Sequence, residues 1–431
     1  MTAPASTGRR WPRRLALVAL WLLWVAIGRG FVSSNDGSHV ALARALALRH
    51  ETSIDPDVAL TLWVDRAERD GHHYSDRPPG TAFAALPAVW LGAQLDPVLR
   101  DRALAHGQMV VRPAGDAFAE TYVARARRHG RAPALVQYQG TALLVVMHAA
   151  AMGLLGLLAL ERWLVDRGMS KGARAFAMIT VALATSWGPY STTLFSHVTS
   201  GTLWCIALLA AARGRAGSDR WAVIAGLAGA WAVASDYVLV VPIGLQLALA
   251  MPPRRWGLLL LGAAAPAIAT AAYHHAAFGA WWSIGYDHHA AFAFARERGS
   301  TFAGNPVTGA WTLLGLGEGA GVLAIAPVMA LGVAALPSLR EPRLLLPLLP
   351  WLLLLCLHRT PSGGATLDHR YLVPAVPIVG LGLAVAWQRW IAEPQAHLQH
   401  PWRARAVLWL CLLVAVASCV LVWSHFVSWR G

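Results

Sequence analysis

The sequence predicts an all-α polytopic membrane protein, on the strength of three observations. Of the 431 residues, 56% are hydrophobic and only 13% are charged, a balance that soluble proteins of this length do not show. Apolar runs of spanning length recur from LALVALWLLWVAIG near the N-terminus to AVLWLCLLVAVASCVLVW near the C-terminus. Arginines gather in alternate connecting loops. Because lipid cannot satisfy backbone polar groups, the apolar runs must form helices.

The hydrophobic runs and the loop charges together predict about eleven transmembrane helices. The first follows RRWPRR, and no small-x-small cleavage pattern follows it, so we expect a retained helix rather than a secretory signal. The excess of arginine in alternate loops places the N-terminus inside and the C-terminus outside. The predicted spans are 14–31, 135–160, 174–190, 198–213, 221–236, 238–252, 256–277, 319–337, 343–358, 371–388 and 405–424.

The loops on the predicted outer face hold most of the remaining polar sequence. Residues 32–134 form a long first external loop, a length that usually indicates function. Within it we predict a short amphipathic helix beginning at Ser38 as its cap and an interfacial helix over 81–95, interrupted by Pro87. Residues 98–134 are predicted to be a polar insertion. Two further external loops are predicted at 278–317 and 358–370, all within one transmembrane domain, 1–431.

Charge and cysteine usage exclude two classes of function. The net charge is +14, from 36 basic and 22 acidic residues. The arginines are spread over short loops rather than one patch, so nucleic-acid binding is not predicted. The four cysteines lie in apolar runs with no obvious pairing, and we expect neither a disulfide framework nor cysteine chemistry.

Four segments on the predicted outer face carry candidate functional residues. They contain Asp36, HHYSDRPPG at 72–80, YSTTLFSH at 190–197 and HRYLVPAVP at 369–377. Each segment alone has a plain structural interpretation. An aspartate at a helix start is often a cap, DRPPG can be a proline-stiffened turn, and an arginine at a span boundary can be an interfacial anchor.

Taken together and in this order, the segments resemble the lipid-linked-sugar glycosyltransferases of the GT-C fold. The resemblance is to bacterial relatives of the dolichyl-phosphate-mannose-protein mannosyltransferases and of the lipid A aminoarabinose transferase. In those families a DKPP-like segment closes the first external loop. Here the segment is SDRPPG, with Arg77 in the place of the lysine. HRYLVPAVP is similar to the PRYLLPALP segment of many such bacterial proteins. The resemblance covers most of the chain as architecture, but only these short segments as motif.

This resemblance implies an enzyme of the bacterial cytoplasmic membrane with its active site on the external side. It would move a sugar from a polyprenyl-phosphate donor to a hydroxyl of a glycolipid, polysaccharide or protein, by an inverting mechanism. A phosphate leaves as a stable anion, so one carboxylate suffices where a glycosidase needs two. We predict Asp36 as the catalytic base, with Arg77 and Arg370 as the groups that hold the donor phosphate.

Five further residues are predicted as acceptor-binding or accessory groups: Asp76, His197, Glu318, His39 and Tyr371. No cofactor is predicted with certainty, and a divalent metal is not favoured, because no DxD motif follows Asp36. The histidine doublets at 72–73, 274–275 and 288–289 offer metal ligands, but adjacent side chains rarely point at one ion. Glu318 has an ordinary interpretation as an acid at a helix N-terminus.

Two other classes of function stay open at this level. A transporter would place ionisable groups near the bilayer midplane or break helices in matching halves. In this sequence His148 is almost the only ionisable residue deep in a run, and no halves match. A membrane protein without catalytic activity is the other alternative. The sequence identifies neither the sugar nor the acceptor.

Overall fold

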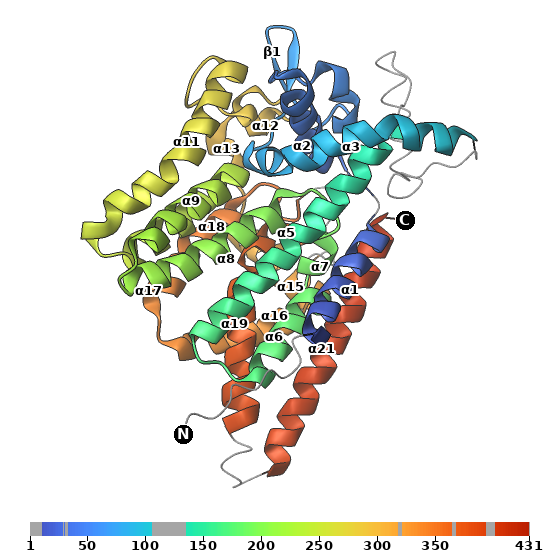
Figure 1. Cartoon of the computed structure of the whole chain (residues 1–431). Coiled ribbons are helices and arrows are strands. Elements are labelled where there is room, and N and C mark those ends of the chain that lie inside the picture. Colours follow the sequence, from blue (N-terminus) through green and yellow to red (C-terminus); the bar gives the residue numbers. More distant parts are fainter. Residues whose placement is uncertain are drawn as a thin grey trace, which may run out of the picture.

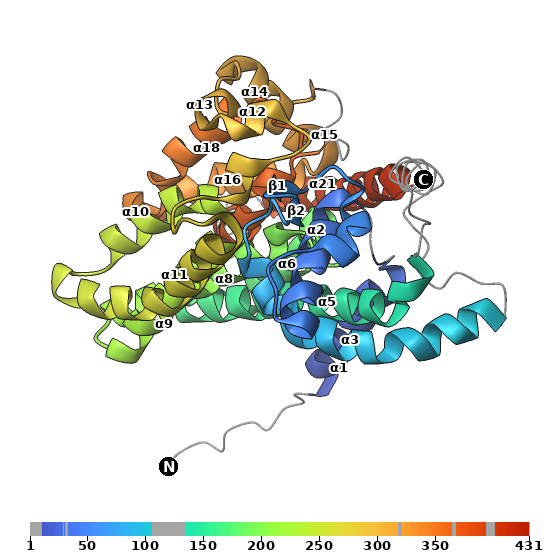
Figure 2. The same cartoon turned by 90° about the horizontal axis from the view of Figure 1, so that it is seen from above.

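The computed structural model describes residues 11–28, 30, 33–105, 135–317, 321–363, 368–393 and 401–430. It is a bundle of helices with a smaller polar layer across one end, formed largely by the first loop (Figures 1 and 2). Every predicted span overlaps one helix of this bundle. Its helices are α1 (Trp11–Ile27), α5 (Gln139–Asp166), α6 (Lys171–Ala184), α8 (Ser196–Arg215), α9 (Asp219–Ser235), α10 (Val240–Ala250), α11 (Trp256–Phe278), α16 (Val328–Ala335), α18 (Leu348–Leu357), α19 (Val376–Trp387) and α21 (Pro401–Arg430).

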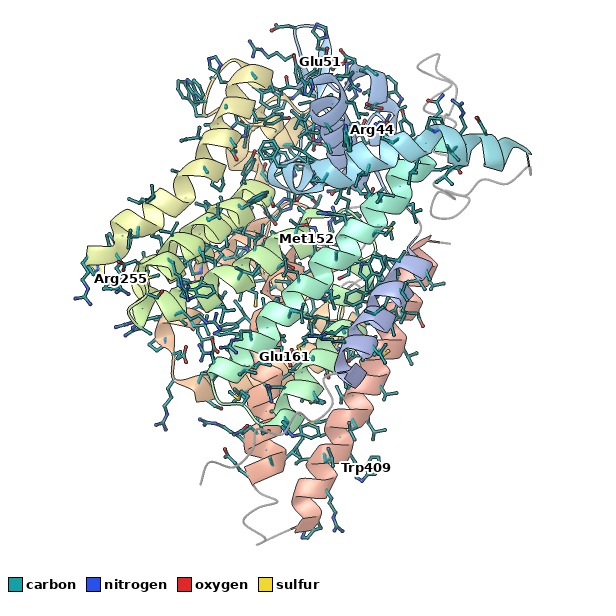
Figure 3. The ribbon with its side chains drawn as sticks, in the orientation of Figure 1. Arg44, Glu51, Met152, Glu161, Arg255 and Trp409 are labelled. Atoms are coloured by element: carbon teal, nitrogen blue, oxygen red, sulfur yellow. The ribbon has the colours of Figure 1, made fainter. Side chains whose placement is uncertain are left out.

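The predicted polytopic class is confirmed. Five helical segments of the described chain are long and apolar enough to cross a membrane: Gly80–Asp101, Gln139–Asp166, Pro253–Phe278, Arg370–Ala392 and Arg405–Val427. Four shorter apolar helices accompany them. On α21, Trp409 is 64% exposed and points away from the bundle (Figure 3). A large apolar side chain in that position is expected to face lipid.

Shorter elements connect the bundle and form the polar layer. Those of the first loop are α2 (Ser34–Arg44), η1 (Ala45–Arg49), η2 (Asp55–Thr61), β1 (Ala67–Arg69), β2 (His72–Tyr74), α3 (Gly80–Ala105) and η3 (Leu135–Tyr138). Those further along are α7 (Trp187–Tyr190), η4 (Tyr237–Leu239), η5 (Pro253–Arg255), η6 (Gly285–His288), α12 (Ala293–Arg296), α13 (Arg298–Thr301), α14 (Pro306–Leu314), α15 (Val322–Ile325), η8 (Leu336–Leu339), α17 (Pro342–Leu345), η10 (Arg370–Ala375) and η11 (Gln388–Ala392).

The helix after the first span begins earlier than the sequence predicts. Its cap is Ser33, whose side chain accepts from the backbone N–H of Asn35, while Asp36 bonds back to the backbone of Ser33. This reciprocal pair is a capping box. Ser38, the predicted cap, therefore lies inside α2, where it is fully buried. The prediction chose the wrong serine because the SSNDGS segment offers three of them.

The helix predicted over 81–95 is much longer than expected. In the structure α3 runs from Gly80 to Ala105 and continues through Pro87 and Pro97. The predicted interruption at Pro87 is therefore wrong. The first residues of the predicted polar insertion, 98–105, continue this helix, and residues 106–134 lie outside the described chain. Proline is tolerated in membrane helices when neighbouring groups satisfy the freed carbonyls. Figure 1 shows α3 lying crosswise over the end of α5, as an interfacial helix would.

A two-stranded hairpin in the first loop was not predicted. Strands β1 and β2 pair antiparallel, with Ala67 opposite Tyr74. Asp70 and Gly71 form the turn, with φ values of 53° and 80°. An Asp-Gly pair with both residues in the left-handed region is a favoured two-residue hairpin turn. The signal was therefore present in the sequence as RDGH.

Close backbone contacts hold the first loop on the bundle. A Cβ on Gly37 would lie 1.8 Å from the carbonyl oxygen of Leu60, so α2 packs directly on η2. A Cβ on Gly92 would lie 2.5 Å from the Cα of Thr141, where α3 crosses α5. Only glycine permits approaches of this kind. A separate cluster of buried apolar residues, including Val40, Leu42 and Ile54, fills the interior of this layer.

Candidate active site

Asp36 lies in the first turn of α2 and closes that end of the helix. Its Oδ1 accepts hydrogen bonds from the backbone N–H of Ser33 at 2.8 Å, from the Ser33 hydroxyl at 3.2 Å and from the backbone N–H of Gly37 at 3.0 Å. The residue is 1% exposed. The local structure therefore gives Asp36 a role at the helix start, and its role as a base stays a prediction.

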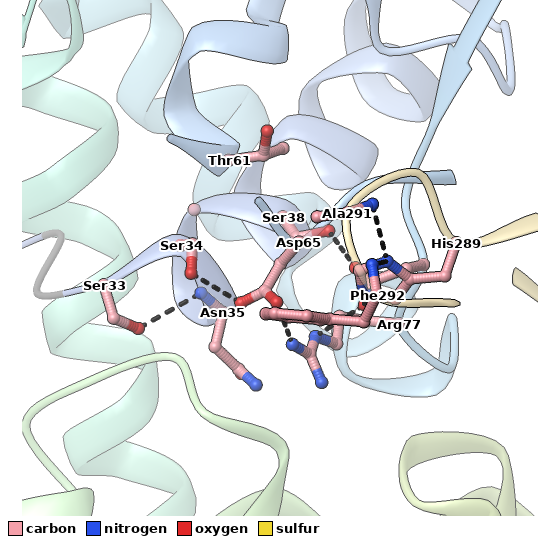
Figure 4. A network of polar contacts seen from close by, with 12 residues as sticks. Ser33, Ser34, Asn35, Ser38, Thr61, Asp65, Arg77, His289, Ala291 and Phe292 are labelled. Atoms are coloured by element: carbon pink, nitrogen blue, oxygen red, sulfur yellow. Dashed lines mark hydrogen bonds and ion pairs between the residues drawn. The ribbon is translucent and has the colours of Figure 1, made fainter. Parts of the chain in front are cut away.

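A buried pair of acids lies beside α2, with an arginine bridging them. The guanidinium of Arg77 places Nη2 2.6 Å from Oδ1 of Asp65 and Nε 3.3 Å from Oδ2 of Asp76. Helix α2 contacts both acids: the hydroxyl of Ser34 donates to Asp65 at 2.6 Å, and that of Ser38 donates to Asp76 at 3.1 Å (Figure 4). The helix that carries Asp36 is thus tied to Arg77 through its two serines.

His289 joins this cluster from the loop that follows α11. A backbone bridge pairs His289 with Ala67 of β1, and Gly285 lies so close that a Cβ there would be 2.7 Å from the Cα of Asp76. The Nε2 of His289 is 3.4 Å from Oδ2 of Asp76. Its Nδ1 accepts from two backbone N–H groups downstream. The proton of the neutral ring therefore lies on Nε2, facing Asp76.

Burial alone would raise the pKa of both carboxyls, but the surrounding charges separate the two. For Asp65, burial is the largest single influence and raises the pKa, but the charge of Arg77, the hydrogen bond from Ser34 and the charge of Arg370 together outweigh it and hold the pKa below its usual value. For Asp76, burial and the negative charge of Asp65 prevail and raise the pKa to about 7. The pair therefore holds one firm negative charge and a second that titrates near neutral pH.

Asp65, Asp76 and His289 are also close enough together to be considered as metal ligands, since their ligand atoms lie within 4.8 Å of one another. The guanidinium of Arg77 already bridges the two carboxylates, and a cation placed there would compete with it. We therefore assign no metal to this cluster. Of the three histidine doublets, only the last contributes to it, while His72 and His73 contact Asp55.

Arg370 lies at the start of η10, the short helix that leads into α19. The carbon of its guanidinium lies 5.6 Å from the ring centre of Phe195 and 5.4 Å from that of Tyr371. Its backbone N–H donates to Asp368 at 3.0 Å, and the hydroxyl of Tyr190 donates to the same carboxylate at 2.5 Å. Side chains from several elements thus surround the start of η10, where the arginine lies.

His197 lies in the first turn of α8 and packs against the same aromatic residues. Its ring centre is 5.8 Å from that of Tyr190 and 5.9 Å from that of Tyr371, both edge-on. Its Nδ1 is 3.9 Å from Oδ2 of Asp236 at the end of α9. The predicted residues His197, Arg370 and Tyr371 therefore form one group.

The two groups of residues meet. Arg370 and Arg77 both lower the pKa of Asp65. Burial lowers the pKa of His39 to about 3, and the charges of Arg77 and His197 act in the same direction. Segments far apart in sequence thus share one electrostatic neighbourhood. The predicted residues that lie in it are His39, Asp76, Arg77, His197, Arg370 and Tyr371. Asp36 lies on the same helix as His39, and Glu318 lies outside the described residues.

Sequence analysis missed Asp65, which the structure places at the centre of the first group. It lies in WVDRAERD, where several charged residues follow one another and no motif distinguishes one acid from the next. The available signal was its position directly after the apolar run that ends at Val64. A carboxylate at the end of such a run can be buried only if a cation pairs with it.

Comparison with known proteins supports the fold that this arrangement indicates. No protein-family model and no curated protein matches the sequence. The chain nevertheless has a polytopic helical fold like the GT-C fold that the sequence predicts. It superposes on the crystal structure of ArnT from Cupriavidus metallidurans bound to undecaprenyl phosphate with a TM-score of 0.54, at 16% identity, over 99% of this chain and 75% of that chain. The apo form of the same protein gives a TM-score of 0.48 at 15% identity, over 97% of this chain and 74% of that chain.

Proposed function

We propose that this protein is a glycosyltransferase that moves a sugar from a polyprenyl-phosphate donor to a hydroxyl acceptor at the outer face of the cytoplasmic membrane. The observation that carries the proposal is the convergence of Arg77 and Arg370 on one buried site. That site lies within a fold shared almost end to end with a protein whose crystal structure contains undecaprenyl phosphate. Two guanidinium groups provide planar forks suited to phosphate oxygens.

The reaction assigns a separate role to each part of the site. The acceptor oxygen attacks the anomeric carbon of the sugar, its proton passes to the carboxylate of Asp36, and the bond from the anomeric carbon to the phosphate oxygen breaks. The polyprenyl phosphate leaves with the bonding electrons, and Arg77 and Arg370 stabilise its charge. Stabilisation of this kind is commonly the largest catalytic contribution. The apolar helices give the isoprenoid tail an environment in which to lie.

Asp36→Asn tests the role of the base. The amide keeps an Oδ1 that can accept the three hydrogen bonds at the start of α2, so helix and donor binding should survive. An amide cannot take the proton, and turnover should fall by about 10²- to 10⁴-fold. The measurement is transfer from radiolabelled polyprenyl-phosphate sugars to membrane acceptors by the purified protein.

The matched control is Ser33→Ala, which removes the cap hydroxyl but leaves the carboxylate in place. Loss of an N-cap costs about 1 kcal/mol of stability and should lower the melting temperature. Because the carboxylate keeps its two backbone N–H bonds, turnover of the folded protein should fall far less than in Asp36→Asn. Near-normal transfer by Asp36→Asn would show that Asp36 serves only the helix and that the base lies elsewhere, Glu318 being the next residue to test.

A further inference from the structure

Helix α2 presents two adjacent polar faces, and only one of them is satisfied by the protein. Residues four apart lie on the same face of a helix. Ser34 and Ser38 share one face and bind the two acids of the cluster. Asn35 and His39 share the next face, beside Asp36. Asn35 is 7% exposed, and His39 is completely buried.

The second face holds polar atoms that lack partners. Among the described residues, the Oδ1 of Asn35 and both ring nitrogens of His39 make no hydrogen bond. Native proteins pair most of their buried polar atoms, so an unpaired group indicates a ligand or an ordered water. Figure 4 shows the amide of Asn35 on the side of Asp65 where the guanidinium of Arg77 also lies. Arg77 also acts electrostatically on His39, so both residues share the neighbourhood of the arginine assigned to the donor phosphate.

His197 supplies a third group of the same kind from the other half of the chain. It is buried, its Nδ1 faces Oδ2 of Asp236 at 3.9 Å, longer than a hydrogen bond, and its Nε2 makes no hydrogen bond with the part of the chain that the structure describes. His197 and Arg77 both lower the pKa of His39, so the two histidines belong to one neighbourhood. Burial keeps the pKa of His39 at about 3, and this ring is neutral at physiological pH.

The chemistry of these three side chains matches a hydroxylated ring better than a phosphate or a prenyl chain. A neutral imidazole offers one donor and one acceptor, and a primary amide offers both as well. A sugar hydroxyl also donates one hydrogen bond and accepts others. A phosphodiester only accepts, and a hydrocarbon does neither. A phosphodiester or a hydrocarbon would therefore leave the acceptor atoms of Asn35 and of the two histidines without a hydrogen-bond donor.

We propose that Asn35, His39 and His197 form the subsite that binds the hydroxyl groups of an uncharged donor sugar. The inference rests on the proposed function and names its substrate class: a neutral, polyhydroxylated sugar whose phosphate is held by Arg77 and Arg370. These residues position the sugar and determine specificity, and they take no proton in the reaction. An ammonium-bearing sugar fits less well, because a protonated amine has no acceptor for the histidine donors and would add positive charge beside Arg77.

The experiment compares two ligands on the purified full-length protein. One is undecaprenyl phosphate, and the other is the same lipid phosphate carrying glucose, galactose or mannose. Substitution His39→Leu should leave binding of undecaprenyl phosphate within about twofold and weaken binding of the best neutral sugar conjugate by about tenfold or more, because a site built for hydroxyls loses its partner. Asn35→Ala should show the same selective loss. His39→Gln, which keeps a donor and an acceptor, should restore part of it.

The outcomes separate this inference from the proposed function. If the wild-type protein binds neither lipid, the proposed function and the subsite both fail. If it binds undecaprenyl phosphate but gains nothing from any neutral sugar, the subsite alone fails. Equal losses for both ligands in His39→Leu and Asn35→Ala, without rescue by His39→Gln, would mean that these residues only support the fold. No loss for either ligand would mean that water satisfies the unpaired atoms.

Discussion

Two partly buried arginines of the first loop each bridge a pair of aspartates, but the two clusters differ in how fully their hydrogen bonds are made. Arg44 binds Asp57 at 3.0 Å and Asp96 at 2.9 Å. The remaining oxygen of Asp57 accepts from Arg49 at 2.8 Å, and Thr141 donates to both oxygens of Asp96 at 2.7 Å. Every carboxylate oxygen of this cluster is therefore occupied.

The cluster around Arg77 also joins one arginine to two aspartates, but its hydrogen bonds are less complete. Nε of Arg77 and Oδ2 of Asp76 are 3.3 Å apart, yet within the described chain neither atom makes a hydrogen bond of normal geometry. The two acids there have pKa values shifted in opposite directions. A fully bonded ionic network fixes structure, whereas an incompletely bonded one can exchange partners with a ligand. We therefore propose that Arg44 serves folding and Arg77 serves binding.

Removal of Arg44 should have the largest effect on stability. Arg44→Ala leaves Asp57 and Asp96 buried without their shared cation, and loss of one partner from a buried ion pair costs about 3–5 kcal/mol. Arg44, which lies close to α3 (Figure 3), also donates to the hydroxyl of Thr141 on α5 at 2.8 Å, so the loss should loosen the first loop from the bundle. Unfolding in detergent, followed by melting temperature, measures the effect.

Glu51→Ala is the matched control, because Glu51 is 57% exposed and pairs with Arg49 only at 3.6 Å. An exposed pair of this kind contributes about 0–1 kcal/mol. A melting temperature for Arg44→Ala close to that of Glu51→Ala would contradict the assignment of Arg44 to folding.

Arg77→Ala should act on donor binding more than on stability. Asp76 has a raised pKa and can become protonated when the cation is lost, which relieves the buried charge. A charge-assisted bond to phosphate contributes about 1.5–3 kcal/mol, so the dissociation constant for undecaprenyl phosphate should rise by roughly ten- to a hundredfold. Arg77→Lys should do less harm, since the families that the sequence resembles have lysine there.

The control for this measurement is Arg100→Ala, which removes an exposed arginine of α3 that pairs with neighbouring Asp101. Donor affinity should not change. If Arg77→Ala lowers the melting temperature as much as Arg44→Ala and leaves donor affinity unchanged, the two clusters serve the same structural purpose.

The helices and part of the Arg77 cluster could be predicted from the sequence, whereas residues that meet only in the fold could not. Periodic apolar runs and loop charge located all eleven bundle helices, because lipid restricts the backbone to helices. Asp76 and Arg77 were found through DRPPG, a local pattern. Asp65 was missed, because its partners Ser34 and Arg77 are distant along the chain and meet it only in the fold.

Helix ends and lengths were less predictable for a related reason. Pro87 suggested a break in α3, but the packing of Gly92 on α5 holds the helix together beyond it. Ser38 suggested a cap, but Asp36 can bond back to Ser33 and so selects the earlier start. In both places tertiary contacts or a reciprocal cap outweighed the preference of a single residue.

The smallest expected effect concerns pH and again separates the clusters. Asp76 is faced by Asp65, Arg77, His289 and the hydroxyl of Ser38, and burial followed by the charge of Asp65 raises its pKa to about 7. Below that pH it is protonated, and Arg77 can turn more of its charge to the phosphate. Above that pH, the ionised carboxylate of Asp76 competes with the donor phosphate for the guanidinium of Arg77. Affinity for a sugar-loaded donor should therefore fall as pH rises through about 7.

The sugar-loaded lipid is the appropriate probe, because its phosphodiester carries one charge throughout this range, whereas a phosphate monoester gains a second near pH 6. A change of about threefold in the dissociation constant between pH 6 and pH 8 would correspond to roughly half a pKa unit of coupling. Asp76→Asn fixes the neutral state and should give an affinity that does not vary over the same interval. Asp96→Asn, in the fully bonded cluster, should retain the pH dependence of the wild type. An unaltered pH dependence in Asp76→Asn would place the titrating group elsewhere and remove the main electrostatic distinction between the two arginines.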